Sequence, residues 1–215
     1  ETKPVINRIG CLPYGLEDKV TMIKTAGLSR SLYGVAADPL NVRQTRAVRM
    51  SIRASLWGNK TSISPAASLL VADRGCLDPW LVAVKRTMKN WKNQVSAGLP
   101  MEVIRAWSDN VAPGNRPAGP VDGLKRMLKK MGWSPMGPDK ITDQQGSTKS
   151  VTTWTDFVRD AVSRARQVLW VSSAKVRKNY KGLDQGVDEE STTAYFRRLL
   201  KRDGKRAGAL HTVLS

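Results

Sequence analysis

The sequence is poor in cysteine and histidine, from which disulfide frameworks and zinc sites are built, and it lacks the long apolar runs that form membrane spans. Its two cysteines, Cys11 and Cys76, lie far apart and form no Cys-x-x-Cys pair, so neither a disulfide framework nor a zinc ribbon can be built from them. No apolar run approaches the roughly 18 residues that a membrane-spanning helix needs. These absences indicate a reducing compartment and a partner other than a membrane.

Side chains that could catalyse a reaction are also scarce. His211 is the sole histidine, and because the sequence identifies no Ser or Cys partner for it, we interpret it as a capping or surface residue. Asp188, Glu189 and Glu190 directly precede a predicted helix, where the helix dipole explains them better than a metal ion does. The phosphate-binding patterns GxGxxG and GxxxxGK[ST] are absent. We therefore expect no catalytic residue, no metal ion and no cofactor.

Positive charge is what the chain has in excess. It carries 36 Lys and Arg against 18 Asp and Glu, a net charge of +18, and its pI is about 10.4. Such a chain repels itself unless a polyanion neutralises it, and phosphate backbones are the commonest polyanions. The sequence therefore predicts a nucleic-acid partner, and a merely solubilising basic surface is the alternative.

Apolar residues recur at helical spacing along most of the chain, which predicts a mainly α fold. In residues 40–57, for example, Val48, Ile52 and Leu56 recur at every fourth position. Further helices are predicted over residues 15–34, 65–73, 79–97, 101–109, 121–131, 155–179, 191–203 and 207–214. Prolines and glycines interrupt residues 133–152, which favours one or two short β-hairpins there.

Residues 112–120 contain three prolines and two glycines in nine positions. Neither a helix nor a strand propagates through such a stretch, so we predict a domain boundary there. The expected organisation is a helical domain over residues 1–111, a Pro/Gly linker over residues 112–120, and a basic α-rich domain with a small hairpin over residues 121–215.

Short motifs spread over nearly the whole chain resemble the region that follows the polymerase palm in reverse transcriptases of non-LTR retrotransposons. They are SLYGVAADPL and SLWG (residues 31–40 and 55–58), CLDP (residues 76–79), and LKRMLKKMGW with the final LHTVLS (residues 124–133 and 210–215). The first two are similar to the LYG and ALWG signatures of that family's thumb-side helices. The last two are similar to its later LGW and LRT segments.

This resemblance implies a helical, thumb-like first domain and a role in handling RNA. The polymerases of that family need two adjacent Asp residues and a third carboxylate to hold two metal ions about 4 Å apart. No Asp-Asp pair occurs in the sequence. The catalytic palm is therefore missing, and we expect the chain not to be an enzyme.

Basic helical faces are the predicted RNA contacts. Four arginines form a stripe beside the apolar face of residues 40–57, and we expect all four to present guanidinium groups to phosphates; a solvated face is the alternative. They are Arg43, Arg46, Arg49 and Arg53. The other candidates are Lys85, Arg86, Lys89, Lys92, Lys125, Arg126, Lys129, Lys130, Lys175, Arg177, Lys178, Lys181, Arg197, Arg198, Lys201, Arg202, Lys205 and Arg206. So many faces favour extended contact with folded RNA.

Seven tryptophans are many for a chain of 215 residues. Trp133 and Trp154 flank the irregular segment, where an aromatic face could stack on any base. We interpret them as packing residues, with base stacking as the alternative.

Together these features predict a non-catalytic RNA-binding component of a large ribonucleoprotein, and specifically a mitochondrial ribosomal protein derived from a retroelement reverse transcriptase. Its expected partners are RNA, in that case rRNA, and neighbouring proteins, with no membrane and no small-molecule substrate. The chain begins at Glu1 instead of Met, which fits a cleaved import signal and points to the mitochondrial matrix; nucleus and cytoplasm are alternatives. Two other functions stay open: a fragment of an active retrotransposon polyprotein, and a basic scaffold for an acidic protein.

Overall fold

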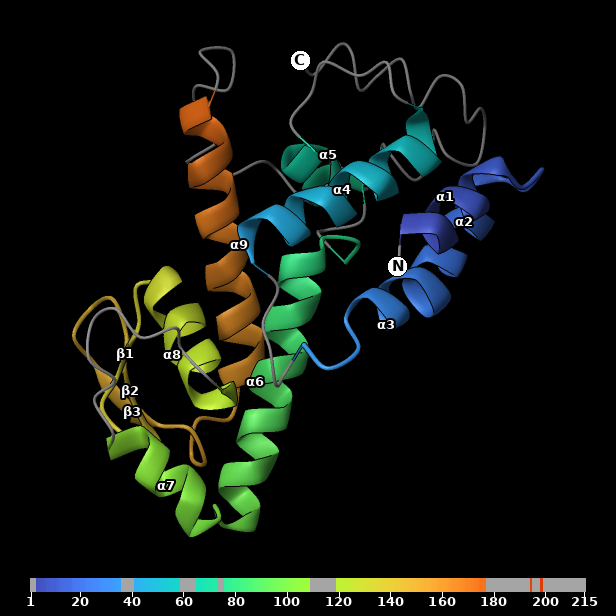
Figure 1. Cartoon of the computed structure of the whole chain (residues 1–215). Helices are drawn as coiled ribbons and strands as arrows, with labels where there is room; N and C mark the ends of the chain where they lie inside the picture. Colours follow the sequence, from blue (N-terminus) through green and yellow to red (C-terminus); the bar gives the residue numbers. More distant parts are fainter. Residues whose placement is uncertain are drawn as a thin grey trace. The chain divides into compact units, whose positions relative to one another are not determined.

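A computed structural model of the chain is mainly helical with one small antiparallel sheet, which confirms the predicted fold class (Figure 1). It describes residues 3–35, 41–58, 65–72, 76–108 and 119–176, together with Ala194 and Arg198. The described residues form two compact units. The first comprises the described parts of Glu1–Tyr33, Leu40–Val82 and Arg166–Ser215, and the second those of Gly34–Pro39 and Ala83–Ala165.

Apart from a helix over Lys3–Cys11 that was not predicted, the described helices follow the predicted ranges. The first unit contains α1 (Lys3–Cys11), α2 (Leu16–Met22), the π-helical turn η1 (Ile23–Gly27), α3 (Leu28–Ser31), α4 (Val42–Trp57) and α5 (Pro65–Ala72). The second contains α7 (Met101–Ser108), α8 (Pro120–Lys130), β1 (Ser134–Pro135), β2 (Lys140–Thr142) and β3 (Thr148–Ser150). Parts of α6 (Pro79–Ala97) and α9 (Phe157–Val176) belong to each unit. The helices predicted over residues 191–203 and 207–214 lie outside the described residues, apart from helical Ala194 and Arg198.

Helix α4 begins one residue after Asn41, which caps it. The Asn41 side chain accepts a hydrogen bond from the Gln44 backbone N–H at 2.8 Å, and the Gln44 side chain accepts one from the Asn41 N–H at 2.9 Å. This reciprocal capping box satisfies two N–H groups that the first turn leaves unpaired. Gly58 ends the helix with a φ of 77°, a left-handed conformation that favours glycine.

Helices α1 and α4 pack closely because small residues meet where they touch. The Ser55 hydroxyl donates a hydrogen bond of 2.7 Å to the Ile6 carbonyl. A Cβ atom on Gly10 would lie 2.8 Å from the Ser55 Cα, a distance that real Cβ atoms essentially never show. Ile6 and Ile52 are fully buried in the same unit. The close approach therefore depends on the absence of a side chain at position 10.

The turn η1 joins α2 to α3 and faces the interior with two of its residues, Ile23 and Gly27. A Cβ atom on Gly27 would lie 3.1 Å from the Ile6 side chain, so glycine also permits close packing here. The Thr25 hydroxyl bonds back to the Thr21 carbonyl at 2.9 Å. The helical segment predicted over residues 15–34 is thus present, with one π-helical turn in it.

The second unit is organised around the amphipathic helix α8 and the sheet. Pro120 occupies the first turn of α8, and Leu124 and Leu128 are buried along its inner face. Strands β1, β2 and β3 pair antiparallel in that order, as two hairpins that share β2. The sheet is the hairpin region predicted over residues 133–152.

The compact units divide the chain differently from the boundary predicted at residues 112–120. Helices α7 and α8 pack together in the second unit on either side of that stretch. Trp107 of α7 packs against Trp91 of α6 with the rings tilted by 43° and their centroids 5.1 Å apart, and the Lys125 ammonium donates to the Trp107 carbonyl at 3.0 Å. Residues 109–118 lie outside the described residues. No helix of the described residues is long and apolar enough to cross a membrane.

Replacing Gly10 with Ala should destabilise the protein by about 1–3 kcal/mol, because the new methyl group forces α1 away from Ser55. Chemical denaturation followed by circular dichroism measures the loss. Gly137→Ala is the matched control, since a Cβ at Gly137 meets nothing within 4 Å, and it should change stability by less than about 0.5 kcal/mol. Equal stabilities for the two variants would contradict the close packing of α1 on α4.

Candidate nucleic-acid interface

The arginine stripe of α4 is divided by the fold into an exposed half and an inward half. Arg43 and Arg46 are exposed, as predicted. Arg49 is half-buried, and Arg53 is buried with 6% of its surface exposed. Because a step of three residues turns about 300° around a helix, Arg49 points about 120° away from Arg43 and toward the buried side of Ile52. The expectation that all four arginines face outward is therefore wrong for Arg49 and Arg53.

Arg49 pairs with the buried carboxylate of Asp78. Its Nε donates to Oδ2 at 2.6 Å and its Nη2 donates to Oδ1 at 3.0 Å, and the Asp78 side chain is 0% exposed. Asp78 Oδ1 also accepts the backbone N–H groups of Trp80 and Leu81 at the start of α6. An aspartate that precedes Pro79 at a helix start is a recognisable cap, but its distant arginine partner cannot be identified from spacing.

Helix α6 presents Lys85 and Lys89 to solvent, one turn apart. The next lysine along the helix, Lys92, is half-buried and donates hydrogen bonds to the carbonyls of Trp154 at 2.7 Å and Thr155 at 3.2 Å. Lys92 therefore holds the loop before α9. The prediction that its ammonium faces outward is wrong. Arg86 is half-buried.

Helix α8 repeats this arrangement. Arg126, Lys129 and Lys130 are exposed at spacings of three and four residues, on the side opposite the buried leucines. Lys125 instead lies against Trp107, with its Nζ 5.2 Å from the ring centroid and bonded to the Trp107 carbonyl. The Lys125 ammonium therefore contacts Trp107 within the second unit, and the prediction that it faces outward is wrong.

The remaining candidates lie at or beyond the end of α9. Lys175 and Arg198 are exposed. The others lie outside the described residues: Arg177, Lys178, Lys181, Arg197, Lys201, Arg202, Lys205 and Arg206. His211 and the acidic run at residues 188–190 also lie outside them.

Six exposed cations form what we call the exposed basic set: Arg43, Arg46, Lys85, Lys89, Arg126 and Lys129. None of them forms an ion pair with another residue that the structure describes. Several acidic side chains are held by contacts elsewhere. Asp139 accepts the Ser150 hydroxyl at 2.7 Å, and Asp156 pairs with Arg159 at 2.7 Å. The exposed basic set therefore keeps its charge available for a partner.

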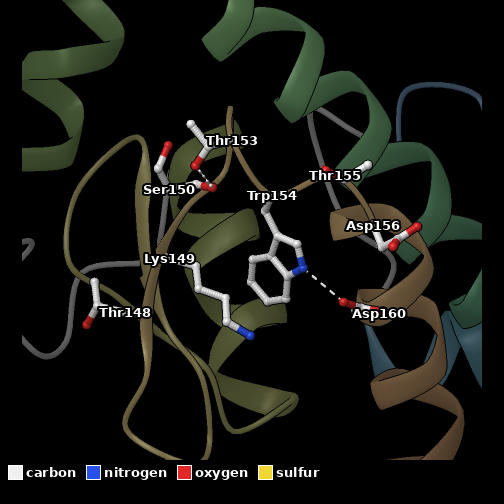
Figure 2. A pocket seen from close by; sticks show the side chains of 8 residues that line it. All are labelled: Thr148, Lys149, Ser150, Thr153, Trp154, Thr155, Asp156 and Asp160. Carbon is white, nitrogen blue, oxygen red and sulfur yellow. Dashed lines mark hydrogen bonds between the residues drawn. The ribbon is translucent and has the colours of Figure 1, made fainter.

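A pocket of about 510 Å³ opens between β3 and the start of α9 (Figure 2). Its lining residues are Thr148, Lys149, Ser150, Thr153, Trp154, Thr155, Asp156 and Asp160. The half-buried Trp154 ring stands in it, and its Nε1–H donates to Asp160 at 2.9 Å. Trp133 and Phe157 pack around this ring with centroids 5.3 and 5.5 Å away. Trp133 is buried, as a packing residue should be, whereas Trp154 is also part of a pocket.

Lys149 links this pocket to the β2–β3 turn. Its Nζ lies 4.6 Å from the Trp154 ring centroid and 3.4 Å from Asp143 Oδ2. Desolvation opposes the ionisation of Asp143, but hydrogen bonds from the backbone N–H groups of Ser147 and Gln145, together with Lys149, hold the pKa of its carboxyl below its ordinary value. Sequence reasoning did not find Lys149 or Asp160, because their roles arise only when the loop folds against α9.

Replacing Arg49 with Gln should destabilise the fold by about 3–5 kcal/mol, because the buried Asp78 carboxylate loses its compensating charge. Urea denaturation measures this effect. Arg46→Gln, one turn earlier on the exposed side, makes the same chemical change and should alter stability by less than about 0.5 kcal/mol. Similar small losses for both variants would show that Arg49 does not support the fold.

Replacing Asp143 with Asn should lower the free energy of unfolding at neutral pH. The difference between the two proteins should shrink as the solution becomes acidic. The folded-state pKa of Asp143 is lowered, so its ionised form contributes stability above the unfolded pKa of about 3.9, and this contribution is lost as the pH falls through the folded value. Denaturation of both proteins between neutral pH and about pH 3 tests this. A deficit that does not change with pH would contradict it.

Comparison with known proteins assigns no family to the chain. It matches no protein-family model, no curated protein and no solved structure. The candidate interface therefore stands on the residues, contacts and charges described above.

Proposed function

We propose that the chain is a non-catalytic RNA-binding component of a ribonucleoprotein, and that it holds RNA phosphates with the exposed basic set. The observation that carries this proposal is that the six cations are exposed and form no ion pair within the described part of the chain. An overall charge of +18 adds the long-range attraction that a polyanion needs.

The spacing of these cations suits a phosphate backbone. They come in pairs separated by three or four residues on α4, α6 and α8, and such pairs lie about 5–6 Å apart at their Cβ atoms. Long basic side chains so placed can each reach a phosphate without reading a base. The exposed face of α6 adds Asn93, an amide that bonds to phosphate or sugar oxygens. We therefore expect binding that depends on RNA shape more than on sequence.

We include in this proposal that the chain transfers no nucleotide by itself. Two-metal nucleotidyl transfer needs clustered carboxylates, and the sequence contains no adjacent Asp pair. The resemblance to the post-palm region of retrotransposon reverse transcriptases agrees with an RNA-handling part that lacks its catalytic centre. Incorporation of nucleotides on a template-primer by the pure chain would instead favour an active polyprotein fragment.

Neutralising each pair of the exposed basic set should weaken RNA binding and reduce its salt dependence. Each phosphate contact contributes about 0.7–0.9 to the slope of log affinity against log salt, so each double variant should flatten the slope by about 1.4–1.8. The variants are Arg43→Gln with Arg46→Gln, Lys85→Gln with Lys89→Gln, and Arg126→Gln with Lys129→Gln. Filter binding or fluorescence anisotropy with a structured RNA, over a range of salt concentrations, measures the slope.

The double variant Arg8→Gln with Arg30→Gln is the matched control. Both arginines are exposed, and the pair lowers the net charge equally at positions that do not belong to the exposed basic set, so its slope should equal that of the unmodified protein. Unchanged slopes for all three test variants would refute the proposed phosphate contacts. Failure of the unmodified protein to bind RNA, with binding to an acidic protein instead, would refute the function.

A further inference from the structure

The pocket around Trp154 has the features of a site for a single flat ligand (Figure 2). We propose that it binds one unpaired RNA base, stacked on the Trp154 ring, and that it prefers guanine. This inference rests on the proposed RNA binding and names the part of the RNA that a second kind of contact recognises. The phosphate contacts of the exposed basic set give affinity, whereas a base in this pocket gives selectivity.

The Trp154 ring is fixed before any ligand arrives. Its Nε1–H is bonded to Asp160 at 2.9 Å, and its backbone carbonyl accepts the Lys92 ammonium at 2.7 Å. Trp133 and Phe157 pack around the ring. A base that stacks on a ring already held from several directions need not order it, which lowers the entropic cost of binding.

Lys149 marks the position that the base would take. Its ammonium lies 4.6 Å from the Trp154 ring centroid, and 44% of its side chain is exposed. A contact between an exposed ammonium and an aromatic ring is weaker than the stacking of a base on that ring. The base therefore displaces Lys149, and the released ammonium is free to contact the phosphate of the same nucleotide.

The carboxylates of the pocket favour a base with hydrogen-bond donors. Asp160 Oδ2 accepts the Trp154 N–H and its Oδ1 lies 3.8 Å from the Arg159 Nε, while Asp156 Oδ2 pairs with Arg159 at 2.7 Å. A carboxylate has about four lone-pair positions, so both residues can accept further donors. Guanine offers adjacent N–H groups on its Watson–Crick edge, whereas uracil offers mainly carbonyl oxygens there. The hydroxyl groups of Thr153 and Thr155 line the same pocket.

A small organic cation is the competing ligand, since an aromatic ring beside two carboxylates also suits an ammonium group. The surrounding charge argues against it. A chain with a net charge of +18 repels free cations and concentrates RNA at its surface. In the absence of RNA, the Lys149 ammonium already makes the cation–π contact with the Trp154 ring, and it is held 3.4 Å from Asp143.

Nuclear magnetic resonance of the indole N–H groups in the full chain tests the proposal directly. The seven tryptophans give separate indole signals, and Trp154→Phe identifies the one from Trp154. Adding the single-stranded RNA UUGUU should shift the Trp154 signal and saturate it. UUUUU should bind about ten-fold more weakly, because it lacks the paired donors.

Substitutions in the pocket should change binding of UUGUU without loss of the fold. Lys149→Ala removes the ammonium that contacts the phosphate of the bound nucleotide, so it should weaken UUGUU binding. The control is Lys140→Ala, which removes an exposed lysine from the neighbouring strand and should leave UUGUU affinity unchanged. Asp160→Asn retains an acceptor for the indole N–H but loses the carboxylate, and it should reduce the preference for UUGUU over UUUUU to about two-fold or less. Trp154→Ala should weaken binding at least about five-fold.

The pocket and the proposed function fail in different ways. If the double variants on α4, α6 and α8 weaken RNA binding while the Trp154 signal is unmoved by UUGUU, the pocket proposal is refuted and the proposed phosphate contacts stand. If tetramethylammonium shifts the Trp154 signal and UUGUU does not, the pocket is a cation site and the proposal is again refuted. If the unmodified protein binds neither structured RNA nor UUGUU, both proposals fail.

Discussion

The buried carboxylate of Asp78 is the group on which the described fold depends most. A carboxylate removed from water persists only when a charge and hydrogen bonds compensate it, and Asp78 obtains the charge from Arg49 and the bonds from Arg49 and the first backbone N–H groups of α6. One side chain thus begins α6 and ties its start to α4. The exposed lysines of α6 lie further along the same helix, as does Lys92, which holds the Trp154 loop.

Basic side chains have two separate uses in this protein. Arg49, Lys92 and Lys125 point inward and satisfy a carboxylate or backbone carbonyls, so each acts as part of the fold. The exposed basic set forms no ion pair within the described residues, so the mutual repulsion of its like charges lowers the stability of the fold. A bound polyanion would remove that repulsion, so the RNA binding that we propose should raise the stability of the fold.

Most of the helices could be predicted from the sequence because their apolar periodicity is local, and α6 has the predicted ends at Pro79 and Ala97, whereas α1 was not predicted. The direction of a charged side chain is not local in this way. Arg43 and Arg49 look alike on the printed sequence, yet only the second meets a buried acid 29 residues away. The pocket was beyond prediction for the same reason, since Lys149, Trp154 and Asp160 come together only through the turn before α9. The sequence did indicate that Trp154 had two possible roles.

The π-helical turn η1 has a consequence for how the chain can vary in length. Such a turn is an α-helix with one extra residue, so each residue after it faces about 100° away from the direction that an uninterrupted α-helix would give it. Leu28 and Leu32 are buried in this shifted register. Deleting the exposed Thr25 or Ala26 would restore a regular helix and turn both leucines from the interior. A related sequence one residue shorter at this point would therefore need a different apolar pattern from position 28 onward.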